Sequence, residues 1–341
     1  MYRAAPARGA TALVLRDGVS TSAAGATPGL EWRGFGGSRT RFATAALRLA
    51  VRDRPDCVIV GHRHFLSLAP LLSAASPGTR QVLFVYGVEA APKLKRLERL
   101  ALSWVETAFA VSPQTAQAFR DAGAKREIRL WPCSLPASWE LPAPALPSLL
   151  PPRRLLTVAR LASSDGYKGV DHAILALGML PRGSAVLDVV GEGDDRGRLE
   201  RLAADSGMAD AVRFHGRVGD PELRSLYAAC DVFVLPSGGE GFGIVYLEAM
   251  AHAKPVIAAD AGGAPFPVRD GETGWLVPYG RPERLAGRLR ELFEDPERAR
   301  RVALTGRRQV EERFCFAAMV ARAAELLGTA PPAGRGCTSS T

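Results

Sequence analysis

Short runs of β-branched residues alternate with helical stretches along the chain, and this rhythm constrains the fold more than any other feature. Such runs occur at 10–15, 56–61, 80–87 and 107–112, and they recur more densely from 154 to 280. Strands followed by helices at this rhythm imply parallel βαβ units. The 341 residues are enough for two domains of roughly 150 residues each. We therefore expect an α/β protein with two domains built on parallel sheets.

A proline-rich segment separates the two halves. Residues 132–153 read PCSLPASWELPAPALPSLLPPR, and proline at this density is incompatible with a helix or a central strand. We predict that this segment is a linker within an N-terminal domain of residues 1–150. A C-terminal domain is then expected at 151–327, and the tail of small residues at 328–341 is expected to be disordered.

The second half follows a doubly wound plan, in which ligands bind beyond the carboxyl ends of the strands. The segments directly after its strands are rich in glycine and charge, so we expect them to converge on one anion-binding site. The expected strands are 155–159, 185–190, 211–214, 231–235 and 255–259, and the expected helices are 169–179, 195–205, 221–228 and 243–252. Helices are also expected within 296–327.

The net charge of +9 lies entirely in the first half. Residues 1–150 hold 19 Lys and Arg against 10 Asp and Glu, whereas 151–341 hold 25 of each. A basic half can attract anionic phospholipid, a pyrophosphate-bearing substrate or nucleic acid, and charge alone does not choose among them. The basic residues are spread singly, without the interleaved aromatics of a nucleic-acid platform, so we expect no nucleic-acid partner. A solvated arginine-rich surface is an equally good interpretation.

The composition is that of a globular protein, with 47% hydrophobic and 23% charged residues. We see no apolar run long enough for a signal sequence or a membrane span, and we expect a cytoplasmic protein, with peripheral attachment to the inner face of the plasma membrane as an option. Its five cysteines form no C-x-x-C pair and lack zinc-finger spacing. We therefore predict reduced thiols and no structural metal.

The segment E-G-F-G-I-V-Y-L-E, from Glu240 to Glu248, is the strongest local signal. Gly241 and Gly243 let the backbone approach a ligand closely, and the amides at a helix start suit a phosphate. Those amides belong to Gly243, Ile244 and Val245. If Glu248 lies about two turns inside the helix, the rise per residue separates the two carboxylates by about 8–10 Å. That spacing fits opposite ends of an extended ligand and is too wide for a paired acid and nucleophile.

Glu240 and Glu248 have a simpler interpretation as a helix-start acid and a solvated surface residue. Glu248 lies, however, on a mostly apolar helical segment, where a carboxylate without a partner would be costly. Arg160 and Lys168 come directly after the strand LLTVA and flank a flexible SSDGY loop. A guanidinium and an ammonium can together neutralise a departing diphosphate. These four residues in this order favour a binding site.

With these motifs the chain resembles the retaining glycosyltransferases of family 4, which have the GT-B architecture. The resemblance is strong over roughly 155–280, through VARLASSDGYKG, VVGEGDDRG and GGEGFGIVYLEAM, and looser over 40–130, through RPDCVIVGH, VLFVYGVE and AFAVSPQTAQAF. It implies two Rossmann-like domains whose parallel sheets face a central cleft. The N-terminal domain looks short by about one βα unit.

The resemblance also implies roles for individual residues. Arg160 and Lys168 would bind the diphosphate of a nucleoside-diphosphate sugar, Glu248 the ribose hydroxyls, and Glu240 the transferred hexose. The remaining contacts would come from the amides of Gly241, Phe242 and Gly243, and, near the base and nucleoside, from Gly191, Glu192 and Arg217.

The implied reaction keeps the anomeric configuration without a protein nucleophile. The diphosphate leaves, an oxocarbenium-like sugar forms, and the acceptor hydroxyl attacks from the same face. No metal or other cofactor is expected. The donor would be of the GDP-mannose or UDP-glucose type, and the acceptor a glycan or polyprenyl-linked glycan of surface polysaccharide biosynthesis.

The chain departs from the family pattern at three places. Tyr86 stands in VYGVE where a histidine is usual, and we expect it to contact the donor, because a tyrosine can hydrogen-bond a sugar hydroxyl. Phe266 stands where a glutamate is expected after GGAP. The glycine-rich loop that usually opens the first helix is not found at the start. His62 directly follows a strand and is a candidate substitute for the histidine. A catalytically impaired homologue, binding a nucleotide sugar or dependent on a partner, is therefore an alternative.

Two further enzyme classes fit less well. The run VVGEGDDRG suggests a Rossmann oxidoreductase, but it sits in mid-domain and lacks a ribose-binding acid about 20 residues on. The two glutamates argue against an epimerase of the same architecture.

Overall fold

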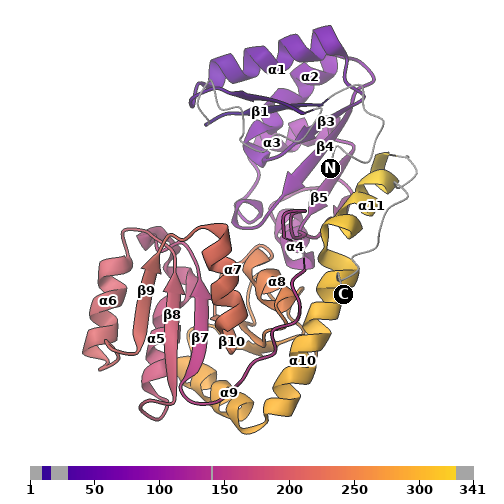
Figure 1. Ribbon diagram of the computed structural model, residues 1–341. Coiled ribbons are helices and arrows are strands. Elements are labelled where there is room, and N and C mark those ends of the chain that lie inside the picture. Colours follow the sequence, from indigo (N-terminus) through magenta and orange to yellow (C-terminus); the bar gives the residue numbers. More distant parts are fainter. Residues whose placement is uncertain (1–9, 17–29, 140, 328–341) are drawn as a thin grey trace. The chain divides into compact units, whose positions relative to one another are not determined.

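The computed structural model describes residues 10–16, 30–139 and 141–327, which divide into two compact units (Figure 1). Apart from Ser112–Gln114, described residues up to Trp131 form the N-terminal unit, and Pro132–Ala318 form most of the C-terminal unit. The division comes at the start of the proline-rich segment and not near residue 150. The tail expected to be disordered lies outside the described residues.

The last of the described helices, α11 (Phe316–Leu327), extends across the expected domain limits. From Met319 onward the chain belongs to the N-terminal unit, although we expected residues up to 327 in the C-terminal domain. Ala323 is fully buried, and with Met319 it packs against an aromatic cluster that includes Phe84, Phe109 and Trp131. Burial of this apolar helix face explains the correction.

The N-terminal unit has two parallel sheets among its described residues, β1-β2 and β3-β4-β5-β6. Its strands are β1 (Ala10–Val14), β2 (Leu30–Gly34), β3 (Cys57–Val60), β4 (Arg80–Val85), β5 (Thr107–Ala110) and β6 (Ile128–Leu130). Its helices are α1 (Arg39–Asp53), η2 (Arg63–Leu68), α2 (Ala69–Ala75), η3 (Val88–Ala90), α3 (Arg96–Ala101), η4 (Leu102–Trp104) and α4 (Pro113–Asp121).

Strands β1, β3, β4 and β5 match the predicted runs, whereas β2 and β6 were not predicted. Most residues of β2 and β6 are exposed, so neither strand shows the apolar run that marks a buried strand in sequence. The predicted lack of a first βα unit stays a prediction.

The C-terminal unit is built on one six-stranded parallel sheet, in the order β12-β11-β10-β7-β8-β9. Its strands are β7 (Arg153–Val158), β8 (Ala185–Val190), β9 (Val212–Gly216), β10 (Val232–Leu235), β11 (Val256–Ala259) and β12 (Trp275–Val277). The helices are η5 (Ser163–Lys168), α5 (Val170–Gly178), α6 (Arg196–Asp205), α7 (Asp220–Ala229), α8 (Ile244–Ala251), α9 (Pro282–Glu294), α10 (Pro296–Gln309) and the π-helical η6 (Val310–Phe314).

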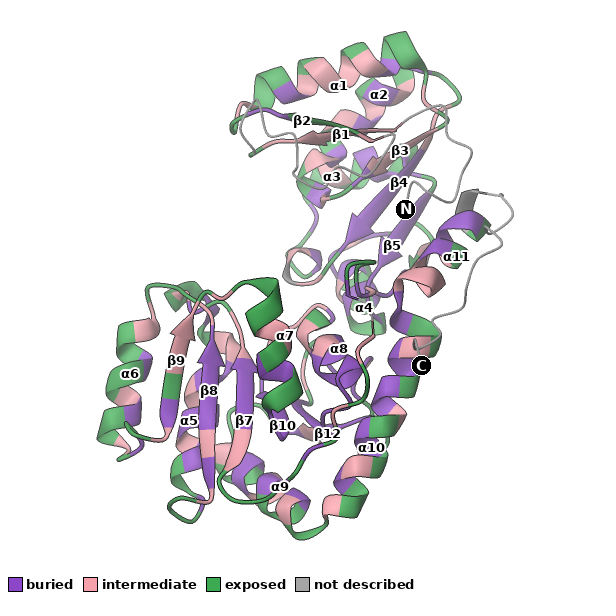
Figure 2. Cartoon of the chain, viewed as in Figure 1, coloured by how far each residue is buried: buried purple, intermediate pink, exposed green. Residues whose placement is uncertain are grey.

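Each strand expected in this half is present, within about two residues at either end. The helix expected at 169–179 is preceded by the 3₁₀ helix η5, which occupies the predicted flexible loop. Figure 2 shows that β7, β8 and β10 are largely buried. Apolar side chains of these strands pack with those of α5 and α9 in one core.

The strand order reverses between β7 and β10. From β7 the sheet grows through β8 to β9 on one side, and from β10 through β11 to β12 on the other. Loops leaving the carboxyl ends of the two neighbouring strands part to opposite faces, which opens a crevice where such folds bind ligands. The sheet topology therefore selects the loops after β7 and β10 as the place to look for a site.

A buried carboxylate fastens the proline-rich segment to this sheet. Asp231, just before β10, accepts hydrogen bonds from the backbone N–H groups of Leu149 at 2.9 Å and Arg154 at 2.8 Å. Asp231 and Leu149 are both buried. The end of the expected linker is thus part of the C-terminal core.

Among the cysteines that the structure describes, one differs from the prediction. Cys57, Cys133 and Cys230 are free, as expected, but Cys315 is disulfide-bonded. Within the described ranges, no helix is both long and apolar enough to cross a membrane.

Candidate functional site

The loops after β7 and β10 are joined by an ion pair. Lys168, at the end of η5, donates a hydrogen bond of 2.6 Å from Nζ to Oε1 of Glu240. The same loops share a backbone bond, from the N–H of Gly238 to the carbonyl of Tyr167 at 2.7 Å. Two of the predicted site residues, 72 positions apart in sequence, therefore meet at the strand-order reversal.

Glycines make this close approach possible. A Cβ on Gly169 would lie 2.4 Å from the carbonyl oxygen of Pro236, and a Cβ on Gly239 would lie 2.8 Å from the ring of Tyr167. Gly169 also has φ +71°, a conformation that side chains disfavour. The two loops can pack in this way only because these positions have no side chain.

The loop after β11 closes on the same place. The N–H of Gly263 donates to the carbonyl of Glu240 at 2.6 Å. A Cβ on Gly263 would lie 1.9 Å from the carbonyl oxygen of Gly241. The GGAP segment thus packs against the backbone of the loop after β10, which we call the glutamate loop because it carries Glu240.

The loop after β8 packs on the loop after β7. The N–H of Leu161 donates to the carbonyl of Glu192 at 2.9 Å. Asp194 accepts from the N–H and the hydroxyl of Ser163 at 2.8 and 2.6 Å, and these bonds hold the pKa of Asp194 below its usual value. The predicted convergence of the loops is confirmed for β7, β8, β10 and β11.

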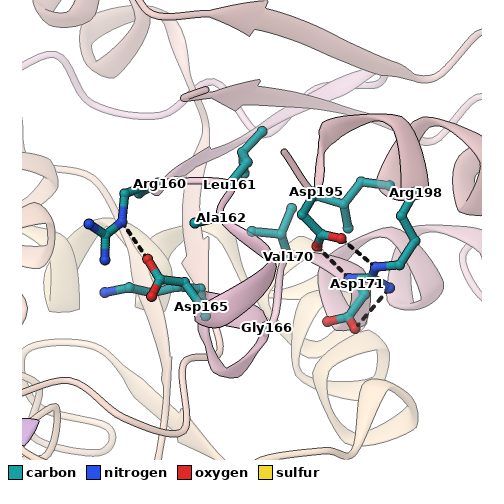
Figure 3. Close-up of a pocket in the computed structure, with 11 residues that line it drawn as sticks. Arg160, Leu161, Ala162, Asp165, Gly166, Val170, Asp171, Asp195 and Arg198 are labelled. Carbon is teal, nitrogen blue, oxygen red and sulfur yellow. Dashed lines mark hydrogen bonds and ion pairs between the residues drawn. The ribbon is translucent and has the colours of Figure 1, made fainter. Parts of the chain in front are cut away.

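Arg160 lies at the edge of this cluster with its guanidinium in solvent. Its side chain is 70% exposed, and Nε pairs with the buried carboxylate of Asp165 (Figure 3). Among the described residues the terminal nitrogens Nη1 and Nη2 have no partner, so Asp165 orients the guanidinium and leaves two donors available. Asp165, which sequence reasoning passed over, was visible only as an acid inside the predicted flexible loop.

A cluster of three charged residues, Asp171, Asp195 and Arg198, lines the same small pocket as Arg160 and Lys168 (Figure 3). Arg198 donates two bonds of 2.7 Å to Asp195 and lies 3.6 Å from Asp171. These bonds tie the start of α6 to the start of α5. The guanidinium of Arg198 is thus shared between two carboxylates, whereas the guanidinium of Arg160 is exposed to solvent.

Glu248 is the fifth residue of α8, and so lies about one turn inside the helix and not two as expected. Its Oε2 accepts a 2.7 Å hydrogen bond from the hydroxyl of Tyr227, whose side chain is fully buried. Burial raises the pKa of Glu248, and the bond from Tyr227 opposes this shift. Tyr227 was missed by sequence reasoning, because a tyrosine in a helix reads as a core residue.

The turn that opens α8 is held by Gly243. This residue has φ +90°, and a Cβ here would lie 2.3 Å from the ring of Tyr246. The helix has no side-chain cap, so the first-turn N–H groups, including those of Ile244 and Val245, have no acceptor within the helix. The amides predicted to bind phosphate are therefore placed at an uncapped helix start.

Phe242 turns its ring into the protein. It is buried, with its ring centroid 5.9 Å from that of Phe266 and 5.5 Å from that of Phe314. Only the backbone of Phe242 is left for the role predicted with Gly241 and Gly243. Phe266, which replaces the expected glutamate, is an aromatic packing residue here.

The residues expected near the nucleoside lie after β8 and β9. Gly191 donates its N–H to the carbonyl of Gly216 at 2.8 Å, and a Cβ on Gly191 would lie 1.8 Å from the carbonyl oxygen of Ala159. Glu192 and Arg217 are both exposed, and Nη1 of Arg217 lies 3.7 Å from Oε1 of Glu192. These three predicted residues are brought together at one edge of the loop cluster.

Tyr86 and His62 belong to the N-terminal unit, after β4 and β3. The exposed Tyr86 donates its backbone N–H to the carboxylate of Glu89. The Nδ1 atom of His62 accepts from the N–H of His64 at 3.2 Å. Burial and the neighbouring His64 lower the pKa of His62. The suggestion that His62 substitutes for the usual histidine stays a prediction.

Among residues the structure describes, no group of three or more His, Cys, Asp or Glu side chains is arranged to hold a metal ion. The expectation that no metal or other cofactor is needed stays a prediction.

Two family models match the chain, one in each half. The model for glycosyl transferases group 1 matches residues 146–309, and the model for glycosyltransferase family 4 matches residues 2–138. The interval between the two matches, residues 139–145, lies within the proline-rich segment.

Curated relatives match mainly part of the chain. The GDP-mannose-dependent alpha-(1-6)-phosphatidylinositol monomannoside mannosyltransferase of Mycobacterium tuberculosis is 37% identical over 180 residues, which are 50% of this chain and 47% of that protein. The D-inositol 3-phosphate glycosyltransferase of Streptomyces avermitilis is 40% identical over 140 residues, which are 40% of this chain and 30% of that protein. The matches span about half the length of these relatives, or less.

Solved structures match over most of the chain. Sucrose-phosphate synthase from Thermosynechococcus elongatus has a TM-score of 0.72 at 25% identity, covering 85% of this chain and 77% of that one. Anabaena HepE, solved with UDP and glucose, has a TM-score of 0.73 at 22% identity, covering 88% and 86%. The second likeness is one of fold. From the two family models, the parallel sheets and these neighbours, the chain belongs to the family 4, group 1 glycosyltransferases of GT-B fold.

Proposed function

We propose that this protein transfers a hexose, with retention of configuration, from a nucleoside-diphosphate sugar to a glycan or lipid-linked glycan acceptor. The observation that carries the proposal is the Lys168–Glu240 pair, which joins the loops after β7 and β10 where the strand order reverses. Arg160 stands beside this pair with its guanidinium exposed. Cations and carboxylates in one crevice suit a donor that carries both a diphosphate and a sugar.

Arg160 and Lys168 would stabilise the charge that develops on the leaving diphosphate. Asp165 holds Nε of Arg160, so Nη1 and Nη2 are pre-oriented, and pre-oriented donors cost little reorganisation when charge develops. Lys168 gives one of its three hydrogens to Glu240, which leaves two for phosphate oxygens. The uncapped start of α8 would add backbone N–H groups to the same anion.

The two glutamates would act on different parts of the donor. Glu240, fixed by Lys168, would accept hydrogen bonds from the transferred hexose. Glu248, fixed by Tyr227 through Oε2, would accept from the ribose hydroxyls with its other oxygen. No protein nucleophile is required, because the acceptor hydroxyl attacks the face from which the diphosphate leaves, and the reaction is proposed to need no metal.

The donor is proposed to be of the GDP-mannose or UDP-glucose type. The mycobacterial relative is named for its dependence on GDP-mannose, and the shared segment of 180 residues lends support to the guanine nucleotide. Gly191, Glu192 and Arg217, grouped after β8 and β9, are the residues proposed to face the base and nucleoside.

The acceptor is proposed to be a membrane-held or pyrophosphate-linked intermediate of surface polysaccharide assembly. The whole net charge of +9 lies in residues 1–150, which favours an anionic acceptor or membrane. We place the reaction at the cytoplasmic face of the plasma membrane.

A second function, nucleotide-sugar binding without transfer, is favoured by two substitutions. Tyr86 replaces the usual histidine, and Phe266, packed against Phe242, replaces a glutamate. A measurable nucleotide affinity with no turnover on any donor would identify this alternative.

A thermal-shift panel of UDP, GDP, UDP-glucose and GDP-mannose tests the donor site. A ligand that binds only the folded state raises the midpoint in proportion to the logarithm of its concentration over Kd. One nucleotide is expected to stabilise the protein selectively, and Lys168→Ala is expected to abolish that shift. Lys125→Ala, an exposed lysine of the N-terminal unit, is the control. No shift with any of the four ligands would contradict the donor site, whereas a shift accompanied by hydrolysis or transfer supports the enzyme.

A further inference from the structure

An apolar face of the N-terminal unit is left in solvent on α3 and η4. Leu97 is 74% exposed, Leu100 is 59% exposed and Trp104 is 39% exposed. Leu97 and Leu100 are three residues apart on α3, which places them side by side on one helix face, and Trp104 follows in η4. Singly exposed leucines are ordinary, but three large apolar side chains within eight positions are not.

Basic side chains surround these three residues. Lys93, Lys95, Arg96 and Arg99 are all exposed, and none forms an ion pair with another residue in the part of the chain that the structure describes. Glu98, the acid within this stretch, is turned to the inside, where it pairs with Arg63 at 2.9 Å. We call Lys93, Lys95, Arg96, Leu97, Arg99, Leu100 and Trp104 the α3 surface.

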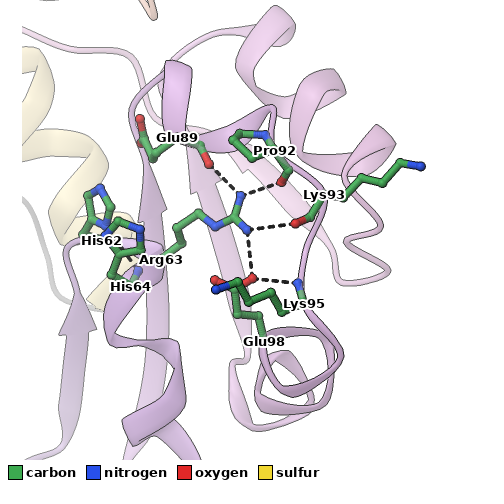
Figure 4. A network of polar contacts seen from close by, with 8 residues as sticks. All are labelled: His62, Arg63, His64, Glu89, Pro92, Lys93, Lys95 and Glu98. Atoms are coloured by element: carbon green, nitrogen blue, oxygen red, sulfur yellow. Dashed lines mark hydrogen bonds and ion pairs between the residues drawn. The ribbon is translucent and has the colours of Figure 1, made fainter.

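A buried arginine fixes the backbone that carries the α3 surface. Nη1 of Arg63 donates to the carbonyls of Glu89 and Pro92 at 2.8 and 2.7 Å, and Nη2 donates to the carboxylate of Glu98 at 2.9 Å (Figure 4). Figure 4 also shows the Lys93 side chain pointing away from this network. The lysine therefore remains available on the outer side.

The end of the α3 surface is fixed in the same way. Nε of Arg126 donates to the carbonyl of Leu102 at 3.1 Å, and its Nη2 donates to the carbonyl of Ser103 at 2.5 Å. Ala101 and Leu102 are buried below. The backbone that carries the exposed leucines and tryptophan is thus fixed by hydrogen bonds and by buried side chains on its inner side, and is not a loose loop.

We propose that the α3 surface docks the N-terminal unit on an anionic lipid bilayer. Leucine and tryptophan enter the interfacial region while lysine and arginine remain at the level of anionic headgroups. The charge complementarity selects an anionic membrane as the occupant, because four unpaired cations around an apolar patch would repel a second copy of the same surface. Each cation near such a membrane strengthens binding about fivefold.

This inference rests on the proposed function for its purpose, which is to bring the site to a lipid-held acceptor. It does not rest on nucleotide binding, so the two can fail separately. Lipid binding is measured without nucleotide, and the nucleotide-induced thermal shift is recorded on each variant as an independent readout of the donor site.

The test is co-sedimentation with vesicles of phosphatidylcholine alone or mixed with phosphatidylglycerol. Wild type is expected to sediment with the mixed vesicles, and less so as salt is added. The double variant Leu97→Gln/Leu100→Gln and the triple variant Lys93→Gln/Arg96→Gln/Arg99→Gln are each expected to weaken binding, the triple variant on the order of a hundredfold.

Matched controls make the same chemical changes elsewhere in the N-terminal unit. Val51→Gln/Leu71→Gln removes two exposed apolar residues, and Arg39→Gln/Arg41→Gln/Arg48→Gln removes three exposed charges. The proposal would be overturned if the wild-type protein did not bind anionic vesicles. It would also be overturned if the control variants lost as much binding as the α3 variants. A concentration-dependent dimer that Leu97→Gln/Leu100→Gln abolishes, with no vesicle binding, would assign the surface to a second copy instead.

Discussion

Glu248 shows how one residue can combine a binding role with a cost in stability. It lies on a helix whose neighbours Leu247 and Ala249 are fully buried, and its carboxylate is balanced by a single hydroxyl, that of Tyr227. A half-buried carboxylate with one hydrogen bond retains acceptor capacity for a ligand. Sites for polar ligands are commonly placed where the unliganded protein is not at its most stable.

Tyr227→Phe is expected to weaken both the fold and the donor site. Loss of a hydrogen bond to a charged group costs about 1.5–3 kcal/mol, and the freed carboxylate loses its orientation. Denaturant unfolding should show this decrease, and the nucleotide-induced thermal shift should fall. Tyr279→Phe is the control, because no hydrogen bond of the Tyr279 hydroxyl is found in the described structure. An unchanged nucleotide shift in Tyr227→Phe would contradict the orienting role.

Glu248→Gln is expected to change the pH dependence of stability. The pKa of Glu248 is raised in the folded protein, so the folded state binds its proton more tightly than the unfolded state. That contribution is fully present below the unfolded pKa and is lost as pH rises through the folded pKa. Glutamine does not titrate, so the stability of the variant relative to wild type should increase as pH rises through this window and then level off.

The measurement is the free energy of unfolding across mildly acidic to neutral pH, with Glu222→Gln on α7 as an exposed control. At neutral pH the Glu248→Gln variant should be more stable than wild type and yet lose the nucleotide-induced shift. A difference between variant and wild type that is the same at every pH would rule out the raised pKa as its cause.

At the scale of elements, the site is a set of loops packed backbone to backbone. The loops after β7, β10 and β11 touch through Gly169, Gly239 and Gly263, where any Cβ would collide. Contacts of this kind define positions more tightly than contacts between flexible side chains, because little can relax. The positions of Glu240 and Lys168 are therefore set by how the loops pack together, and not by the two residues alone.

Gly263→Ala is expected to displace the glutamate loop. Its Cβ would lie 1.9 Å from the carbonyl oxygen of Gly241, and overpacking of this kind costs about 1–3 kcal/mol. The thermal midpoint and the nucleotide-induced shift should both fall. Gly287→Ala in α9, where a Cβ meets nothing within 4 Å, should instead add about 0.5–1 kcal/mol by helix propensity. Equal effects of the two substitutions would show that loop packing is not the cause.

At the scale of the whole molecule, two segments belong to a different unit from the one that their position in the sequence suggests. Part of the proline-rich segment is bound into the C-terminal sheet through Asp231, and α11 packs in the N-terminal unit. Both assignments come from buried contacts between residues far apart in the chain.

Asp231→Ala is expected to unfasten the proline-rich segment from the sheet. It would leave the N–H groups of Leu149 and Arg154 without acceptors, and each unsatisfied buried group costs about 1–3 kcal/mol, or about 2–6 kcal/mol in total. Denaturant unfolding of the full chain measures this loss. Asp210→Ala, at an exposed position, should stay within about 0.5 kcal/mol of wild type. Similar values for both would refute the anchoring role.

The α/β class, the parallel strands of the C-terminal unit and the candidate residues Arg160, Lys168, Glu240 and Glu248 were all determined by the sequence itself. A buried strand is visible in sequence as an apolar run, and glycines and charged residues directly after it indicate the sheet edge where ligands bind. Both signals are local, so the sequence alone reveals them. The exposed strands β2 and β6 lack that local signal, and they appear only once their hydrogen-bonded neighbours are in place.

Only the tertiary structure decided which residues support the site and where the units divide. The hydroxyl of Tyr227 on Glu248 and the return of α11 to the N-terminal unit each join segments whose proximity is set by packing, whereas the carboxylate of Asp165 reaches Arg160, five residues away, through the fold of a single loop. No local pattern records such pairs, since burial and hydrogen bonding depend on what the rest of the chain brings near. The sequence determined what the site is made of, and packing determined what holds it.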